Sequence, residues 1–140
     1  MPASSARYYR LNKLSLVDPV MNLMEQARRL SDYWSPRVVG QINDQYVKVA
    51  KVKGELAWHK HDREDEMFLI LAGRLRIEYG DRPSVDLEPG DMHIVPRGVM
   101  HNPSCDSECL LALIEPMSTQ HTGDTMTEKT VSVSDQLADF

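Results

Sequence analysis

Short runs rich in apolar residues follow one another between residues 37 and 115, and turn residues separate them. The runs cover residues 37–42, 46–53, 58–61, 67–71, 74–79, 84–87, 92–95 and 109–115, and in 74–79 apolar and polar residues alternate strictly. Asn43-Asp44, Gly73 and Gly98 lie in the gaps, and such residues favour hairpins and turns. Short strands at spacings of about 8 to 12 residues are typical of an antiparallel sandwich or barrel. The pattern therefore predicts an all-β fold.

A helical period precedes the strands. The apolar residues that recur at the spacing of one helix face are Leu23, Met24, Ala27 and Leu30. Asp18-Pro19 offers an N-cap acceptor followed by proline at the first helical position, and Pro36 disfavours helix in the residue before it. We therefore predict a helix over about residues 19–33, with its apolar stripe packed on the sheet.

These patterns divide the chain into four segments of one domain. Residues 1–17 show little periodicity and are predicted to form an N-terminal arm, and residues 18–35 hold the helix. Residues 36–116 are predicted to form the barrel, and residues 117–140, rich in serine and threonine, a C-terminal tail that lies over it. A chain of 140 residues is long enough for one hydrophobic core.

Charge and apolar content argue against two classes of partner. The formal net charge is −5, whereas phosphate binding needs concentrated lysine and arginine, so we expect no nucleic acid. The longest apolar runs, residues 67–72 and 109–114, are too short to cross a bilayer, so we expect no membrane partner. The first residues lack the apolar stretch of a signal peptide, which predicts a cytoplasmic protein.

Three histidines and one glutamate form the most informative pattern in the chain. His59 and His61 are separated by one residue, so on an extended strand both imidazoles point to the same face. The charged stretch 62–65 is predicted to turn, and Glu66 then begins the next strand on that face. His101 comes from a distant strand. We predict that these four residues bind one metal ion.

The residues around this set resemble a known family. The stretch from Gly54 to Gly73 contains His59, His61 and Glu66, and the stretch from Gly90 to His101 contains Pro96-Arg97-Gly98. Both resemble the signature motifs of the cupin superfamily, most closely the small single-domain bacterial cupins described as similar to mannose-6-phosphate isomerase. The resemblance implies a jelly-roll β-barrel, also called a double-stranded β-helix. It also implies that His59, His61, Glu66 and His101 bind a divalent metal ion inside the barrel.

Several other residues have alternative interpretations. Glu64 has the same strand parity as Glu66 and is the rival carboxylate, although solvent exposure or a place beside the ligands is the simpler expectation. His93 is expected to be structural, and His121 either caps the barrel mouth or is a loop residue. Cys105 and Cys109 lack further soft ligands nearby, so neither a redox pair nor a thiolate metal site is expected. No catalytic residue is assigned; Glu64, Tyr79 and His121 are the acid or base candidates.

The ligand set limits the chemistry. Three imidazoles and one carboxylate leave about two positions open on an octahedral ion, which suits Fe, Mn, Ni or Zn. A structural zinc site is usually closed and rich in thiolates. We therefore expect a metal-dependent small cupin enzyme acting on a small polar metabolite, of the dioxygenase or the isomerase/lyase type. The alternative is a non-catalytic cupin that binds a sugar or a small acid.

An open jelly roll leaves strand edges without partners, and proteins cover such edges to prevent aggregation. We expect a homodimer built from edge strands with the help of residues 1–17 and the helix. A small-molecule substrate or ligand is the other expected partner.

Overall fold

The computed structural model of the chain describes residues 20–123 and 130–138. The elements in these ranges are α2 (Leu23–Arg28), β1 (Arg37–Ile42), β2 (Gln45–Glu55), β3 (Glu66–Ala72), β4 (Leu75–Tyr79), β5 (Val85–Leu87), β6 (Met92–Val95), β7 (His101–Pro116) and α3 (Val133–Gln136). All strand pairs are antiparallel, which confirms the all-β prediction. No helix in the described ranges is long and apolar enough to span a membrane.

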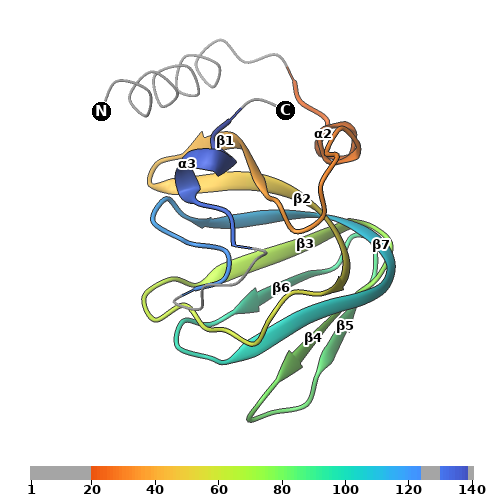
Figure 1. Cartoon of the computed structure of the whole chain (residues 1–140), viewed down its shortest axis with the longest axis vertical. Helices are drawn as coiled ribbons and strands as arrows, with labels where there is room; N and C mark the ends of the chain where they lie inside the picture. The colour runs from red at the N-terminus through yellow and green to blue at the C-terminus, as the bar shows by residue number, and fades with distance from the viewer. Residues whose placement is uncertain (1–19, 124–129, 139–140) are drawn as a thin grey trace.

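Strand β7 connects the two parts of the sheet. Its first residues pair with β4, from Tyr79↔His101 to Arg76↔Ser104. Its later residues lie between β2 and β3 in the order β1-β2-β7-β3-β6, while β4 also pairs with β5. Figure 1 shows β7 curving from the side of β4 and β5 toward β2 and β3. The sheet therefore wraps around an interior without closing.

Most of the predicted strands are confirmed, with small differences at their ends. Residues 37–42 and 92–95 form strands with the predicted bounds, and Asn43-Asp44 forms the hairpin turn between β1 and β2. Asn43 takes a φ of 49°, which asparagine tolerates better than most residues. The run 109–115 is part of a longer strand, because β7 begins at His101.

The strand predicted at 58–61 is wrong. In this segment only His59 makes a β-bridge, to His101. The rest of the segment is irregular, because β2 ends at Glu55 after a bulge between Val52 and Gly54. The two histidines at the same strand parity do not by themselves impose a strand on this segment.

The predicted helix is also too long. Helix α2 begins at Leu23 because the Asn22 side chain accepts a 2.9 Å hydrogen bond from the Glu25 N–H, which makes Asn22 the N-cap. The helix ends at Arg28, well before Pro36. The expected cap at residues 18 and 19 is therefore wrong for the helix that forms, and Pro19 and the arm of residues 1–17 lie outside the described residues.

The inward face of the strands forms the hydrophobic core, as strand parity predicts. Phe68 and Ile70 lie on the Glu66 face of β3, and Leu75 and Ile77 alternate with the more exposed Arg76 and Glu78 on β4. A second, smaller cluster lies on the outer face of the sheet. It joins Ala27 and Leu30 to Val49 and Leu110, with Leu23 and Met24 packed against it, so the predicted helical stripe does pack on the sheet.

The segment after β7 packs on the barrel. Thr119, His121 and Thr122 are buried, and Gly123 lies directly against the backbone of Lys60 in the loop that holds the histidines. Ser118 donates a 3.1 Å hydrogen bond from its hydroxyl to the Glu64 carboxylate in the same loop. Helix α3 lies near β1 (Figure 1). Residues 117–123 therefore cover the end of the barrel at which the histidines gather.

Candidate metal centre

Three different parts of the fold supply the four predicted ligands. His59 and His61 lie in the loop between β2 and β3, Glu66 is the first residue of β3, and His101 is the first residue of β7. The loop is tied to β7 by two 2.9 Å hydrogen bonds, in which the backbone N–H groups of His59 and His101 donate to each other's carbonyl oxygens. This bridge places the two imidazoles together although no regular strand carries His59.

The four side chains converge on one point. One potential ligand atom from each of His59, His61, Glu66 and His101 lies within 4.8 Å of all the others. All four residues are buried, with at most 3% of their surface exposed. The ring centroid of His59 lies 4.4 Å from that of His101 and 5.1 Å from that of His61.

Backbone carbonyls orient two of the imidazoles. His59 Nδ1 lies 2.8 Å from the Ala57 carbonyl oxygen, and His101 Nδ1 lies 2.9 Å from the Val99 carbonyl oxygen. A carbonyl oxygen only accepts, so both Nδ1 atoms carry the proton and both Nε2 atoms present a lone pair. Five polar atoms of the group are buried without a hydrogen-bond partner. They are these two Nε2 atoms, the two ring nitrogens of His61, and Oε1 of Glu66.

The electrostatics of the metal-free site favour the metal-binding forms of His59 and Glu66 but the protonated form of His61. Burial, followed by the neighbouring His101, lowers the pKa of His59 to about 4, so this imidazole is neutral at pH 7. Burial alone would raise the pKa of Glu66, but polar contacts from His101 and His61 outweigh it and hold the pKa well below the usual range. Burial would likewise lower the pKa of His61, and the nearby Glu66 carboxylate raises it instead.

The donor set fits a divalent ion. Buried polar atoms are almost always hydrogen-bonded, so a group of orphaned acceptors directed at one point calls for a cation. Imidazole nitrogens and a carboxylate oxygen suit Fe, Mn, Ni or Zn, and no thiolate is present in the group. The ligand roles of the four residues stay a prediction, and the geometry described here is compatible with them.

A buried lysine and a buried glutamate lie in contact beside Glu66. Lys48 Nζ is 2.7 Å from Glu115 Oε1, and both side chains are completely buried. Burial and the charge of Glu66 raise the pKa of Glu115 well above its ordinary value. Lys48 Nζ also donates to the Thr119 carbonyl at 3.4 Å, which ties β2 to the segment after β7. This pair is not among the residues predicted from the sequence.

Strand parity holds the signal that could have identified it. Lys48 occupies an inward position of β2, and Glu115 shares the inward face of β7 with Leu111 and Leu113. A lysine and a glutamate at inward positions of paired strands indicate a buried ion pair, because unpaired charges are almost never buried.

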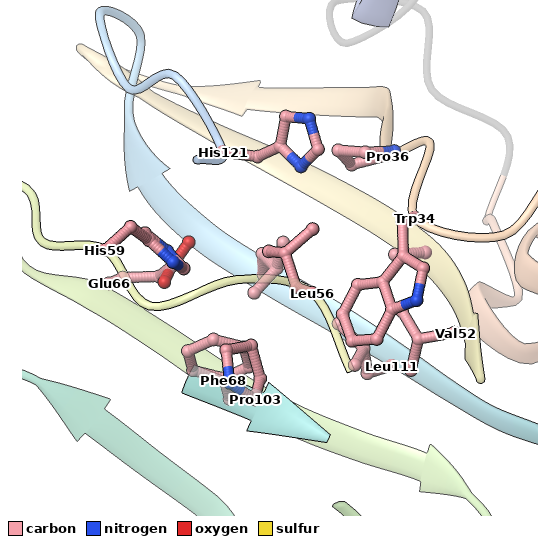
Figure 2. A pocket seen from close by; sticks show the side chains of 12 residues that line it. Trp34, Pro36, Val52, Leu56, His59, Glu66, Phe68, Pro103, Leu111 and His121 are labelled. Carbon is pink, nitrogen blue, oxygen red and sulfur yellow. The ribbon is translucent and has the colours of Figure 1, made fainter. Parts of the chain in front are cut away.

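A cavity lies beside the ligands. Its volume is about 30 Å³, and its walls come from the core side of β2, β3 and β7 and from the segment before β1. Figure 2 shows His59 and Glu66 at one end of the cavity and Trp34, Val52 and Leu111 at the other. His121 lies above, beside Pro36 (Figure 2).

The remaining candidates occupy distinct places. Glu64 is partly exposed and accepts a hydrogen bond from Ser118, outside the ligand group. His93 Nε2 lies 2.7 Å from the Tyr79 hydroxyl oxygen, which agrees with a structural role for His93. His121 lines the cavity, and its Nε2 accepts a 2.7 Å hydrogen bond from the Val131 N–H. Cys105 and Cys109 are buried and unpaired with each other.

Comparison with known proteins identifies the family. Residues 46–115 match the model of the family described as the Cupin domain. The uncharacterized protein YdbB of Bacillus subtilis is 30% identical over 82 residues, which cover 59% of this chain and 73% of YdbB.

Solved structures agree with this match. A cupin-2 domain containing protein from Shewanella frigidimarina is 38% identical, with a TM-score of 0.66, over 69% of this chain and 94% of that protein. Together with the family match, this similarity confirms the predicted cupin-type jelly roll. Hydroquinone 1,2-dioxygenase from Sphingomonas sp. TTNP3, solved with 4-hydroxybenzoate bound, is 16% identical with a TM-score of 0.58. The match covers 68% of this chain and 72% of the dioxygenase chain, and at this identity it shows similarity of fold alone.

Proposed function

This chain belongs to the cupin domain family, and we propose that it is a metal-dependent enzyme that acts on a small molecule. One observation carries the proposal. The Nε2 atoms of His59 and His101, the ring of His61 and Glu66 Oε1 are all buried, lack hydrogen-bond partners and face one point. Leaving several polar atoms buried and unpaired is costly, and a bound cation removes that cost.

The protein's own groups prepare the site before an ion arrives. The carbonyls of Ala57 and Val99 fix the tautomers of His59 and His101, so two lone pairs face inward without rotation of either ring. The apolar walls beside the ligands keep bulk water away from a bound molecule. A bound divalent ion would supply Lewis-acid chemistry or, as iron, reaction with dioxygen.

The reaction type is a narrower part of the proposal. Hydroquinone 1,2-dioxygenase has a similar fold, which is compatible with dioxygenase chemistry. Three histidines and one glutamate around a divalent ion are equally compatible with an isomerase or a lyase. The mannose-6-phosphate isomerase-like subtype receives less support, because a phosphorylated sugar needs many polar partners and the cavity walls are mainly apolar. A cytoplasmic location also stays a prediction.

The first experiment measures metal binding. The purified protein is stripped with a chelator and titrated in a calorimeter with Mn²⁺, Ni²⁺ and Zn²⁺, and with Fe²⁺ under anaerobic conditions. We expect one equivalent per chain. His59→Gln, His61→Gln, Glu66→Gln and His101→Gln should each lower the affinity more than about 100-fold, because losing a group that merely orients a ligand already costs about 10- to 100-fold.

His93→Gln is the matched control, because His93 is a histidine of the same barrel that contacts Tyr79 outside the ligand group. It should bind metal as the wild type does. A wild-type protein that binds no equivalent, or ligand variants that bind normally, would refute the proposal. With Fe²⁺ loaded, oxygen uptake upon adding a candidate substrate distinguishes an oxygenase from an isomerase or lyase.

A further inference from the structure

The cavity beside the metal centre has two chemically different ends. His59 and Glu66 stand at one end (Figure 2), and both belong to the predicted ligand set. The other end is closed by Trp34, Val52 and Leu111, with Leu56 and Phe68 between the two ends. Among these five side chains only Trp34 has a polar atom, and its indole Nε1–H already donates to the Lys53 carbonyl at 2.8 Å.

Trp34 is held in a specific position. Its φ is 56°, a left-handed conformation that bulky residues rarely adopt. Two hydrogen bonds maintain it, from the Trp34 N–H to the Lys51 carbonyl at 2.9 Å and from the indole to Lys53. Strained residues persist only where the surrounding structure holds them, and they concentrate at functional sites. The indole therefore forms a fixed apolar end wall.

We propose that the substrate joins an oxygen-chelating head, which reaches the metal, to a short apolar tail that lies between Leu56, Leu111 and Trp34. This inference rests on the proposed function and names the class of substrate. A hydroxyl between Leu56, Leu111 and Trp34 loses its hydrogen bonds to water, and these three side chains offer none in return because the Trp34 indole already donates to Lys53. Sugars and polyols are therefore the wrong class.

The size of the cavity limits the tail. Its volume of about 30 Å³ is on the order of one water molecule's share of the liquid. The tail is therefore short, of about one or two carbons, and a longer one requires Leu111 or a neighbouring side chain to move. Close packing makes such movement unfavourable.

Hydroxamates with one head group and different tails provide the test. The protein is loaded with Co²⁺, and the visible spectrum of the ion follows each titration. The key pair is propionohydroxamate and glycolohydroxamate, which differ by a terminal methyl group against a hydroxyl of similar size. Titration of both compounds into free Co²⁺ gives the difference in their affinity for the ion without the protein. After that correction we expect propionohydroxamate to bind at least about tenfold more tightly.

Acetohydroxamate and butyrohydroxamate extend the series. From acetohydroxamate to propionohydroxamate, affinity should rise about fourfold for the added methylene. Butyrohydroxamate should bind no better than propionohydroxamate to the wild type, because the cavity is full. Leu111→Ala, or Val52→Ala if the first variant is too unstable, removes side-chain volume at the end away from the metal. Either variant should make butyrohydroxamate the tighter ligand of the two.

Leu110→Ala is the matched control. Leu110 neighbours Leu111 on β7 and is equally buried, but it packs under α2 on the opposite face of the sheet. The Leu110→Ala variant should be destabilised about as much as Leu111→Ala, and propionohydroxamate and butyrohydroxamate should keep their wild-type order of affinity. Failure of Co²⁺ to bind would refute the proposed function. Normal Co²⁺ binding with glycolohydroxamate equal to or tighter than propionohydroxamate, or with no change of order in the cavity variants, would overturn the apolar-tail inference alone.

Discussion

Individual buried side chains determine how the protein responds to acid. The pKa of His59 falls to about 4 in the folded chain, mainly because the imidazole is buried. An exposed histidine titrates near 6.5, so between these values the unfolded chain binds a proton that the folded chain does not. Stability from His59 is therefore complete above about pH 6.5 and declines as the pH falls toward 4.

We expect the metal-free protein to lose about 2 kcal/mol of unfolding free energy through His59 between pH 7 and pH 5. Urea unfolding at several pH values measures the loss, and His59→Asn should show a correspondingly shallower decline. The raised pKa of His61 acts in the opposite direction in both proteins, so the difference between them reports on His59. Parallel declines in wild type and variant would contradict the prediction.

Lys48 and Glu115 make a second prediction at the residue scale. Their contact is fully buried, so removing either side chain leaves the other without its partner. Lys48→Met and Glu115→Leu should each destabilise the protein by about 3 to 5 kcal/mol, and the double variant should lose far less than their sum. A double-mutant cycle from urea unfolding gives the coupling.

The exposed Arg76–Asp86 pair, with a 3.3 Å contact between Nη1 and Oδ1, is the control for that cycle. It should show coupling of about 1 kcal/mol or less. Additive effects at Lys48 and Glu115 would mean that the buried contact contributes nothing to stability.

At the scale of elements, the sequence predicts strands better than the segments between them. Six of the predicted runs correspond to β1 through β6 except for their ends, because short runs rich in apolar and β-branched residues between turn residues are typical of paired strands. The run 58–61 has His59 and His61 at the same strand parity but is irregular, since its position depends on the bridge between His59 and His101. A contact between residues so distant in sequence leaves no local signal.

In the candidate site too, residues on strands are predicted from the sequence better than residues in irregular segments. Glu66 and His101 begin strands, and their convergence with His59 and His61 followed from order and spacing. Trp34 was not found, because its place in the cavity results from the conformation of an irregular segment before β1. Helix α2 was overextended because Asp18-Pro19 is a plausible start, whereas Asn22 is the N-cap observed.

Alanine substitutions at two glycines distinguish the energetic cost of a left-handed backbone from the cost of close packing. Gly73, with φ 82°, ends β3, and a Cβ there would lie 2.6 Å from the Glu108 carbonyl oxygen of β7. Gly90, with φ 90°, has open space at the same position. Gly90→Ala should therefore cost about 1 kcal/mol, for the backbone alone, and Gly73→Ala roughly 2 to 4 kcal/mol.

Chemical denaturation of the two alanine variants checks this prediction, and Gly90→Ala serves as the control for the left-handed backbone. Equal losses would show that β7 moves aside at little cost near Glu108. A larger loss at Gly90 would contradict the packing argument.

At the scale of the whole molecule, one part of the sheet's outer face stays uncovered in the described structure. Edge strand β6 exposes Met92 and Ile94, which sit opposite the half-buried Leu69 and Met67 of β3. Helix α2 covers a neighbouring area around Val49 and Leu110 instead. An exposed apolar edge of this kind favours pairing with another chain.

We expect a homodimer in which a second copy covers this edge. Light scattering at micromolar concentration should give about twice the chain mass, and Ile94→Lys should shift the protein toward monomer. Ile42→Lys is the control, because Ile42 is also exposed but lies at the β1–β2 hairpin. A wild-type monomer, or an Ile94→Lys dimer as strong as the wild type, would contradict the proposed interface.

The pairing of β2 with β7 also dictates when the metal site can exist during synthesis. The register runs from Gln45↔Pro116 to Glu55↔Ser104, so His59, His61 and Glu66 all lie in the stretch that this pairing closes. A chain emerging from the ribosome holds three of the predicted donors long before His101 arrives, and the rest of β7 must follow His101 before the strand can pair with both β2 and β4. Metal loading of the proposed site is therefore expected only in the finished barrel, after translation has passed residue 116.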